Sequence, residues 1–277
     1  MKAASMKVWL DGHIVEADAA RIDPRDRGFT LGDGLYETIR VVAGKPLRLA
    51  SHLTRLHSGG AALGLPLPRC DRDVAEAMTD LLRANGLMEG IIRLTLTRGQ
   101  APRGIASPKV PHPTLLMAAF PPAPEPPPAQ VIVAATTRRN EHSPTARFKT
   151  LSALDNIVAR REAEERGADD ALLLNSAGRL ADSTIANVFL VIDQEVVTPP
   201  VSEGALPGVM RADVIERLSA TPTPLSPADI ASASEAFLTN ANGIRALIAV
   251  ADSCGVWQPV GDGHPGPVTL HLKAAVL

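Results

Sequence analysis

The chain has 277 residues, 45% of them hydrophobic, which is enough to bury a substantial core and suggests two modest domains. Its 28 basic and 30 acidic residues leave a formal net charge of −2, so no footprint of a nucleic-acid binder is visible. No apolar run is long enough to span a bilayer, and no signal-peptide core follows the first residues. We therefore expect a cytoplasmic protein with neither a membrane nor a nucleic-acid partner.

The first part of the chain alternates strand and helix patterns. An Asp11-Gly12 pair between apolar residues 8–10 and 14–15 predicts a hairpin, because Asp-Gly supplies the positive φ angles of a tight turn. Strand-like and helix-like spacing then predicts three strands (residues 35–42, 91–97 and 114–118) and two helices (around residues 52–63 and 74–82). Residues 98–113 form a long loop of a kind that is often functional.

A proline-rich stretch divides the chain. Residues 121–128 contain too many prolines for a strand or a helix interior and suit a stiff spacer, so we predict domains over 1–120 and 129–277 with 121–128 as the linker. After it we expect a helix from Leu151 to Gly167 and buried strands at residues 131–134, 171–174 and 188–192. The turns at 176–178 and 193–194 are too short for parallel crossovers, which predicts a mixed α/β fold with substantial antiparallel pairing.

Two residues in the second half suggest the chemistry. Lys149 lies just before the predicted helix, and Asp182 precedes a stretch of small polar residues and then a buried strand. An amine that forms a Schiff base and a carboxylate that partners a pyridine nitrogen are what a pyridoxal-phosphate site requires. Each residue alone has a more ordinary explanation, since most lysines are solvated and an aspartate often caps a turn. The two cysteines, Cys70 and Cys254, have no CxxC spacing, and we expect no metal site.

Two further features suit a phosphate group. Pro207-Gly208 opens a predicted helix whose first residues, Val209 and Met210, present free backbone N–H groups to an anion. Arg55 carries a planar guanidinium that can hold a phosphate through two N–H groups, although a surface ion pair is the default for a single arginine.

Taken together, these motifs resemble the class IV aminotransferase family, the pyridoxal-phosphate enzymes of fold type IV. The resemblance covers most of the chain and rests on residues 26–38, 52–56, 149, 182–189, 208–211 and 237–240. It implies a small N-terminal α/β domain, a larger barrel-like C-terminal α/β domain, a homodimer and pyridoxal 5'-phosphate as cofactor. It makes Lys149 the Schiff-base lysine and assigns the phosphate to Arg55, the amides of Val209 and Met210, and Asn240. The chain departs from the family at Asp182, where a glutamate is usual.

The resemblance leaves the reaction open among three readings. We predict an aminotransferase that moves an amino group between an amino acid and a 2-oxo acid through Lys149. Tyr36 and Arg103 match two members of the carboxylate trap of D-amino-acid transaminases, whereas Ile105 replaces its histidine and Leu154 replaces a tyrosine usual in branched-chain enzymes. Thr38 matches a residue of 4-amino-4-deoxychorismate lyases, which release pyruvate and 4-aminobenzoate. That lyase is the second reading, and a non-catalytic relative that binds the cofactor is the third.

Overall fold

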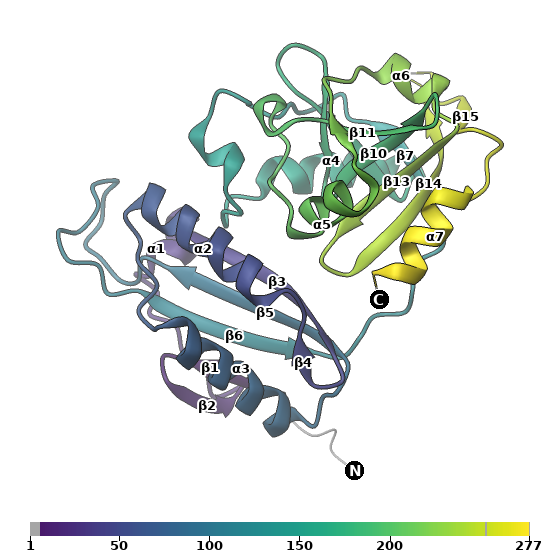
Figure 1. The fold of residues 1–277 in the computed structure, drawn as a ribbon. Helices are drawn as coiled ribbons and strands as arrows, with labels where there is room; N and C mark the ends of the chain where they lie inside the picture. The colour runs from purple at the N-terminus through teal and green to yellow at the C-terminus, as the bar shows by residue number, and fades with distance from the viewer. Residues whose placement is uncertain (1–5, 253, 277) are drawn as a thin grey trace. The chain divides into compact units, whose positions relative to one another are not determined.

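The computed structural model describes residues 6–252 and 254–276, and the chain in it forms two compact units (Figure 1). The first unit comprises the chain up to Pro124 together with Phe148–Ser152, and the second comprises Glu125–Arg147 and the chain from Ala153 onward. Each unit has its own sheet and its own apolar core, which confirms the predicted mixed α/β class. No helix within the described residues is long and apolar enough to cross a membrane.

The first unit is a six-stranded sheet with two helices on one face. The strand order is β2-β1-β6-β5-β3-β4, and the predicted Asp11-Gly12 hairpin joins β1 to β2. The elements of this unit are β1 (Lys7–Leu10), β2 (His13–Glu16), α1 (Arg27–Leu31), β3 (Gly34–Val42), β4 (Lys45–Pro46), α2 (Leu49–Leu63), α3 (Asp71–Asn85), β5 (Gly90–Thr97) and β6 (Thr114–Phe120).

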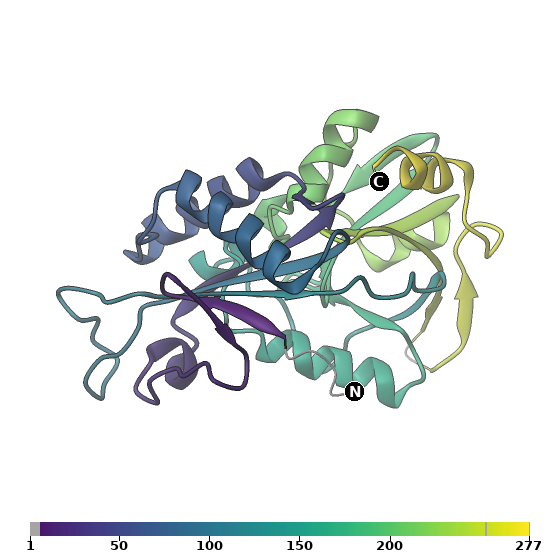
Figure 2. The same cartoon turned by 90° about the horizontal axis from the view of Figure 1, so that it is seen from below.

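Alternation along the strands separates the two faces of this sheet. In β3, Leu35, Ile39 and Val41 are buried and join a core that contains Leu53 of α2 and Met78 of α3. Because successive side chains of a strand point to opposite faces, the residues between them lie on the face away from α2 and α3. The loop between β5 and β6, residues 98–113, extends beyond the end of the sheet (Figure 2).

A short segment from beyond the proline-rich stretch belongs to the first unit. Residues 148–152 lie along β3, where the amide of Tyr36 donates to the carbonyl of Lys149 (2.9 Å) and the amide of Leu151 donates to that of Gly34 (3.0 Å). Phe148 packs against the core of the first unit. The predicted helix start was therefore wrong, because α4 begins only at Leu154 and Lys149 lies in extended chain paired with β3.

The second unit is built on a sheet that curls into a half-barrel, with the strand order β12-β11-β10-β13-β14-β7-β8-β9 and β15 paired to β14. Its elements are β7 (Ala129–Val133), η1 (Pro144–Arg147), α4 (Leu154–Glu165), β8 (Asp170–Leu174), β9 (Leu180–Ser183), β10 (Asn187–Ile192), β11 (Glu195–Thr198), η2 (Val201–Glu203), α5 (Val209–Leu218), β12 (Thr221–Pro222), α6 (Pro227–Ser232), β13 (Glu235–Asn240), β14 (Gly243–Ala251), β15 (Trp257–Pro259) and α7 (Pro267–Ala275). The predicted short turns join antiparallel pairs, β8 with β9 and β10 with β11.

Both faces of the curled sheet are apolar, which explains its continuous hydrophobic strands. In β10, Val188 and Leu190 enter one core with Ile230 of α6, whereas Phe189 enters a second core with Val214 of α5. The ring of Phe189 stacks on that of Phe237 across the strand pair, with ring centroids 5.1 Å apart. A third core lies between α4 and the sheet, and α7 packs along β13 and β14 (Figure 1).

Candidate active site

The residues predicted for the site are divided between the two units. Tyr36, Thr38, Arg55, Arg103 and Lys149 belong to the first unit, and Asp182, Val209, Met210 and Asn240 belong to the second. The sequence analysis expected Lys149 in the second domain, and the structure places it with the first because its segment pairs with β3. Within the described residues, no cluster of three or more His, Cys, Asp or Glu side chains could hold a metal ion.

Lys149 lies against the open face of the first sheet. Its Nζ is 4.4 Å from the centroid of the Tyr36 ring, and the guanidinium carbon of Arg93 lies 4.0 Å from the same centroid. Arg93 is the β5 partner of Thr38, so Tyr36, Thr38, Arg93 and Lys149 are neighbours on one face. The sequence analysis missed Arg93, although its position opposite Thr38 follows once β3 and β5 are paired. The hydroxyl of Tyr36 and the guanidinium of Arg93 make this face suitable for an anionic substrate.

Arg55 is held by a buried carboxylate. Its Nε and Nη2 donate to the two oxygens of Glu37, at 2.8 and 2.5 Å, and His52 Nδ1 lies 2.7 Å from Glu37 Oε2. Glu37 is 1% exposed. Its burial disfavours the charged form, but the hydrogen bonds from His52 and Arg55 outweigh this and lower the pKa of Glu37. A charged carboxylate therefore fixes the orientation of the Arg55 guanidinium.

Arg103 lies on the exposed loop that follows β5. Its neighbour Ile105 is 81% exposed, which is unusual for a large apolar side chain. Arg103 therefore lies outside the strand that carries Tyr36 and Thr38.

Asp182 lies inside β9 and is 3% exposed. Its Oδ1 accepts from Asn187 Nδ2 and its Oδ2 from the amide of Leu206, both at 2.7 Å, and Arg139 Nη2 lies 3.8 Å from Oδ2. Burial raises the pKa of Asp182 to about 6, and Arg139 and the two hydrogen bonds limit this rise. A carboxylate held in this way can partner a protonated ring nitrogen. Asp182 is one methylene shorter than the glutamate usual in the family, however, and each of its oxygens already accepts a hydrogen bond.

The start of α5 has the features of an anion site. The N-cap residue Gly208 supplies no capping side chain, so the first N–H groups of the helix, those of Val209 and Met210, lack helical partners. Asn187 Nδ2 also donates to the carbonyl of Leu206 at 2.8 Å, which fixes the entry to the helix beside Asp182. A Cβ on Gly208 would lie 2.1 Å from Asn187 Oδ1, so any larger residue there would have to displace the Asn187 side chain or the helix start.

Among the described residues of the second unit, three buried polar atoms have no hydrogen-bond partner: Thr239 Oγ1, Arg139 Nε and Arg211 Nε. Thr239 pairs with Asn187 across β13 and β10, which places it near the residues that hold Asp182. Asn240 Oδ1 accepts from the amide of Asn242 at 2.9 Å in the turn after β13, an interaction that the sequence analysis did not foresee. Unsatisfied buried groups near an open helix start fit a bound phosphate-bearing group. Thr239 was missed because a threonine inside a strand gives no sequence signal.

Comparisons with known proteins show the family of the chain. A family model described as amino-transferase class IV matches residues 34–248. A protein of Methanocaldococcus jannaschii, provisionally described as a branched-chain-amino-acid aminotransferase, is 30% identical over 275 residues and covers 97% of this chain and 94% of its own. A D-alanine aminotransferase of Bacillus licheniformis is 28% identical over 276 residues, with 98% and 96% covered. The chain belongs to the class IV aminotransferase family.

Solved structures have the same fold. The Escherichia coli branched-chain amino acid aminotransferase has a TM-score of 0.89 at 24% identity and covers 98% of this chain and 93% of its own. A Legionella pneumophila protein provisionally described as 4-amino-4-deoxychorismate lyase has a TM-score of 0.85 at 30% identity, with 94% and 96% covered. Another neighbour, at TM-score 0.89 and 22% identity, was solved with pyridoxamine 5'-phosphate. The protein is an enzyme of this class, and its cofactor is pyridoxal phosphate.

Proposed function

We propose that Lys149 is the residue through which this aminotransferase exchanges an amino group between an amino acid and a 2-oxo acid. The observation that carries the proposal is the placement of its amine against Tyr36, on the face that also presents Thr38 and Arg93. This placement is fixed by main-chain pairing of residues 149–151 with β3, so it does not depend on a flexible loop. An amine next to groups suited to a carboxylate is what transfer from an amino acid needs.

Each residue then has a definite task. Bound pyridoxal phosphate supplies a ring that withdraws electrons from the Cα of the substrate. The amine of Lys149 would hold the cofactor, and it would move the proton at the Cα of the substrate as general base and acid. Asp182 keeps the ring nitrogen protonated, and its carboxylate is oriented by Asn187 and the Leu206 amide.

The phosphate and the substrate carboxylate would be bound by separate groups. Arg55, oriented by Glu37, and the amides of Val209 and Met210 would bind the phosphate, together with Asn240. The substrate carboxylate would be bound by Tyr36 and Arg103, and Thr38 would line the same face. The unpartnered hydroxyl of Thr239 supports the phosphate assignment, because Thr239 pairs with Asn187, whose side-chain amide fixes the entry to α5.

Substitution of Lys149 tests the proposal. We expect Lys149→Ala to bind the cofactor without covalent attachment and to lose at least about three orders of magnitude in turnover, since both attachment and proton transfer are removed. Lys45, an exposed lysine on β4, is the matched control, and Lys45→Ala should keep wild-type turnover. Turnover is measured as 2-oxo acid formed from D-alanine or L-leucine. Substantial activity in Lys149→Ala would refute the assignment.

We also propose that the enzyme is a homodimer and that it acts in the cytoplasm. Support for the dimer comes from large apolar side chains that are exposed in a single protomer, which include Phe29 (79%), Ile105 (81%) and Leu154 (74%). Exposed apolar residues of this size commonly mark an interface. Sedimentation should give twice the mass of the 29.1 kDa chain, whereas a monomer at micromolar concentration would contradict the dimer. The cytoplasmic location remains a prediction to be checked by fractionation.

The lyase is a second candidate, supported by Thr38 and by the 30% identity to the Legionella pneumophila protein. The two activities start from the same cofactor chemistry, so they are separated by products alone. Release of 4-aminobenzoate and pyruvate from aminodeoxychorismate, at a rate above that of transamination of any amino acid tried, would make the lyase the principal activity.

A further inference from the structure

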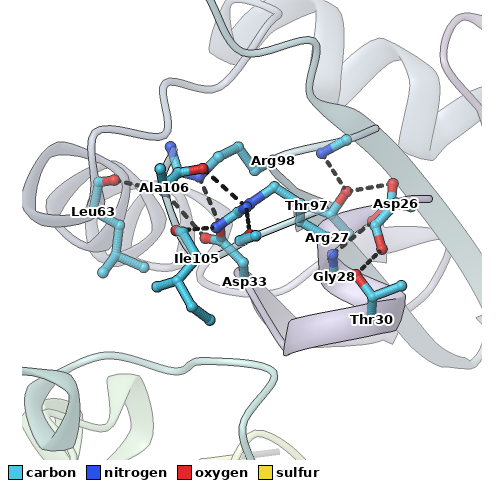
Figure 3. Close-up of polar contacts among 12 residues, drawn as sticks. Asp26, Arg27, Gly28, Thr30, Asp33, Leu63, Thr97, Arg98, Ile105 and Ala106 are labelled. Carbon is cyan, nitrogen blue, oxygen red and sulfur yellow. Dashed lines mark hydrogen bonds and ion pairs between the residues drawn. The ribbon is translucent and has the colours of Figure 1, made fainter. Parts of the chain in front are cut away.

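One buried arginine holds the exposed loop that carries Arg103 through hydrogen bonds to the loop backbone. Arg27 of α1 is 5% exposed, and its Nη1 donates to the carbonyls of Gly104 (2.9 Å) and Ala106 (3.2 Å). Its Nη2 donates to the carbonyl of Ile105 at 3.0 Å (Figure 3). These three carbonyls belong to the residues directly after Arg103. An otherwise exposed segment of backbone is therefore held at consecutive residues by a single guanidinium.

The other side of Arg27 is anchored on a carboxylate shared with Arg98. Arg27 Nε donates to Asp33 Oδ2 at 2.7 Å, and Arg98 donates to Asp33 Oδ2 and Oδ1 at 2.8 and 3.1 Å. Burial disfavours the charged form of Asp33, but the hydrogen bonds from Arg98 and Arg27 prevail and lower its pKa. The Asp33 carboxylate is therefore charged at neutral pH and fixes both arginines.

Arg98 connects this cluster to the end of α2. Its Nη1 and Nη2 donate to the carbonyls of Gly64 and Leu63, at 2.9 and 2.7 Å, which are among the carbonyls left without partners where the helix ends. Arg27, Asp33 and Arg98 thus connect the loop to α2 through hydrogen bonds. The same helix carries Arg55. Only the planar, forked guanidinium can serve a carboxylate on one edge and several carbonyls on the other.

We propose that Arg27 is a positioning residue that holds the backbone next to Arg103, so that Arg103 meets the carboxylate of the amino-acid substrate. The inference rests on the proposed function of Arg103 and adds the residue that determines its place. Arg27 itself touches no substrate. Its effect should therefore appear in substrate affinity, and only while Arg103 is present.

The test compares Arg27→Lys, Arg103→Ala and the double variant in the holoenzyme. Arg27→Lys keeps the positive charge, and Asp33 stays paired with Arg98, so no buried carboxylate is left alone. We expect KM for the amino acid to rise about tenfold with kcat nearly unchanged, because misplacement of a binding group weakens substrate contact. In the Arg103→Ala background the same change should alter kcat/KM by less than about twofold, as for two residues that act as one unit.

Hydrogen exchange of the loop gives a readout that does not depend on turnover. Amides of residues 99–113 should exchange faster in Arg27→Lys than in wild type, while Arg72→Lys, an arginine with 80% of its side chain exposed on α3, should change neither exchange nor KM. If Arg27→Lys does not fold, Arg27→Gln replaces it in every comparison. The proposal would be overturned by an unchanged KM or by unchanged exchange of the loop amides. It would also be overturned if the effects of the two substitutions on kcat/KM multiplied in the double variant. A wild type without aminotransferase activity would refute the proposed function instead, and loop exchange alone would then decide whether Arg27 fastens the loop.

Discussion

Asp182 is an unusual carboxylate because it is buried and also hydrogen-bonded on both oxygens. The Asn187 and Leu206 donors favour its charged form, yet burial raises its pKa to about 6. A glutamate would reach one methylene further. Arg139 Nη2 lies 3.8 Å from Oδ2 and lowers the pKa, which limits the effect of burial. The carboxylate is charged at neutral pH, as its proposed role beside a protonated ring nitrogen requires.

The raised pKa predicts how stability depends on pH. Between about pH 4 and 6 the unfolded chain has released the Asp182 proton while the folded protein retains it, so the free energy of unfolding falls as the pH rises and levels off above about 6. The full change is about 3 kcal/mol. We expect the free energy of unfolding of the cofactor-free wild type, measured with urea, to fall by this amount between about pH 4 and 6 relative to that of Asp182→Asn. A difference between the two proteins that is constant with pH would contradict the prediction.

At the scale of the element, helix α7 takes its N-terminal cap from a strand. Its N-cap residue, Gly266, offers no side chain, and Glu235 of β13 accepts from the amides of Val268 (3.0 Å) and Thr269 (2.9 Å) instead. Thr269 Oγ1 also donates to Glu235 at 2.9 Å. A Cβ on Gly266 would lie 2.1 Å from the Glu235 carboxyl carbon, so the glycine leaves room for the cap.

Removal of this cap should destabilise the second unit. We expect Glu235→Ala to lower the free energy of unfolding by about 2 kcal/mol, because two amides and a hydroxyl lose their acceptor. Glu216, an exposed residue of α5, provides the control, and Glu216→Ala should stay within about 0.5 kcal/mol of wild type. Both values come from denaturant unfolding followed by circular dichroism. Equal effects of the two substitutions would mean that Glu235 contributes nothing as a cap.

The start of α5 gives a second prediction at this scale. Gly208 has φ −66° and ψ 139°, which any residue can adopt, so the requirement for glycine comes from its 2.1 Å approach to Asn187 Oδ1. Gly208→Ala should displace Asn187 or the helix start and weaken pyridoxal phosphate binding by about tenfold, equivalent to about 1.4 kcal/mol. Ala212→Ser, on an exposed position of the same helix, should bind normally. Cofactor titration measures both, and unaltered binding by Gly208→Ala would remove the helix start from the phosphate site.

Across the whole molecule, local patterns predicted the fold better than the site. The Asp11-Gly12 hairpin and helices α2 and α3 were predicted correctly because turn chemistry and apolar spacing are encoded within a few residues. The pairing of Lys149 with β3 was not, since it joins residues far apart in the chain. For the same reason, no local pattern indicated that Arg93 lies over Tyr36 or that Arg27 binds the 104–106 carbonyls.

The predicted site depended on the family resemblance more than on any single residue. Lys149 and Asp182 were ambiguous when considered alone, and the ordered motifs gave them their proposed roles. The surroundings that adjust those roles, such as Glu37 of β3 behind Arg55 of α2 and Asn187 of β10 behind Asp182 of β9, come together only in the folded chain. Sequence patterns report local conformation well, whereas the partners of a buried polar group depend on tertiary structure.

The most direct test of the central claim is a half-reaction with stoichiometric amino acid. Purified holoenzyme is mixed separately with D-alanine, L-leucine and aminodeoxychorismate in the absence of a 2-oxo acid, and the products are quantified. The account predicts one equivalent of 2-oxo acid from one of the two amino acids, followed by return of the amino group to an added 2-oxo acid, and neither event in Lys149→Ala. Release of 4-aminobenzoate and pyruvate over many turnovers, with no 2-oxo acid formed from either amino acid, would contradict it.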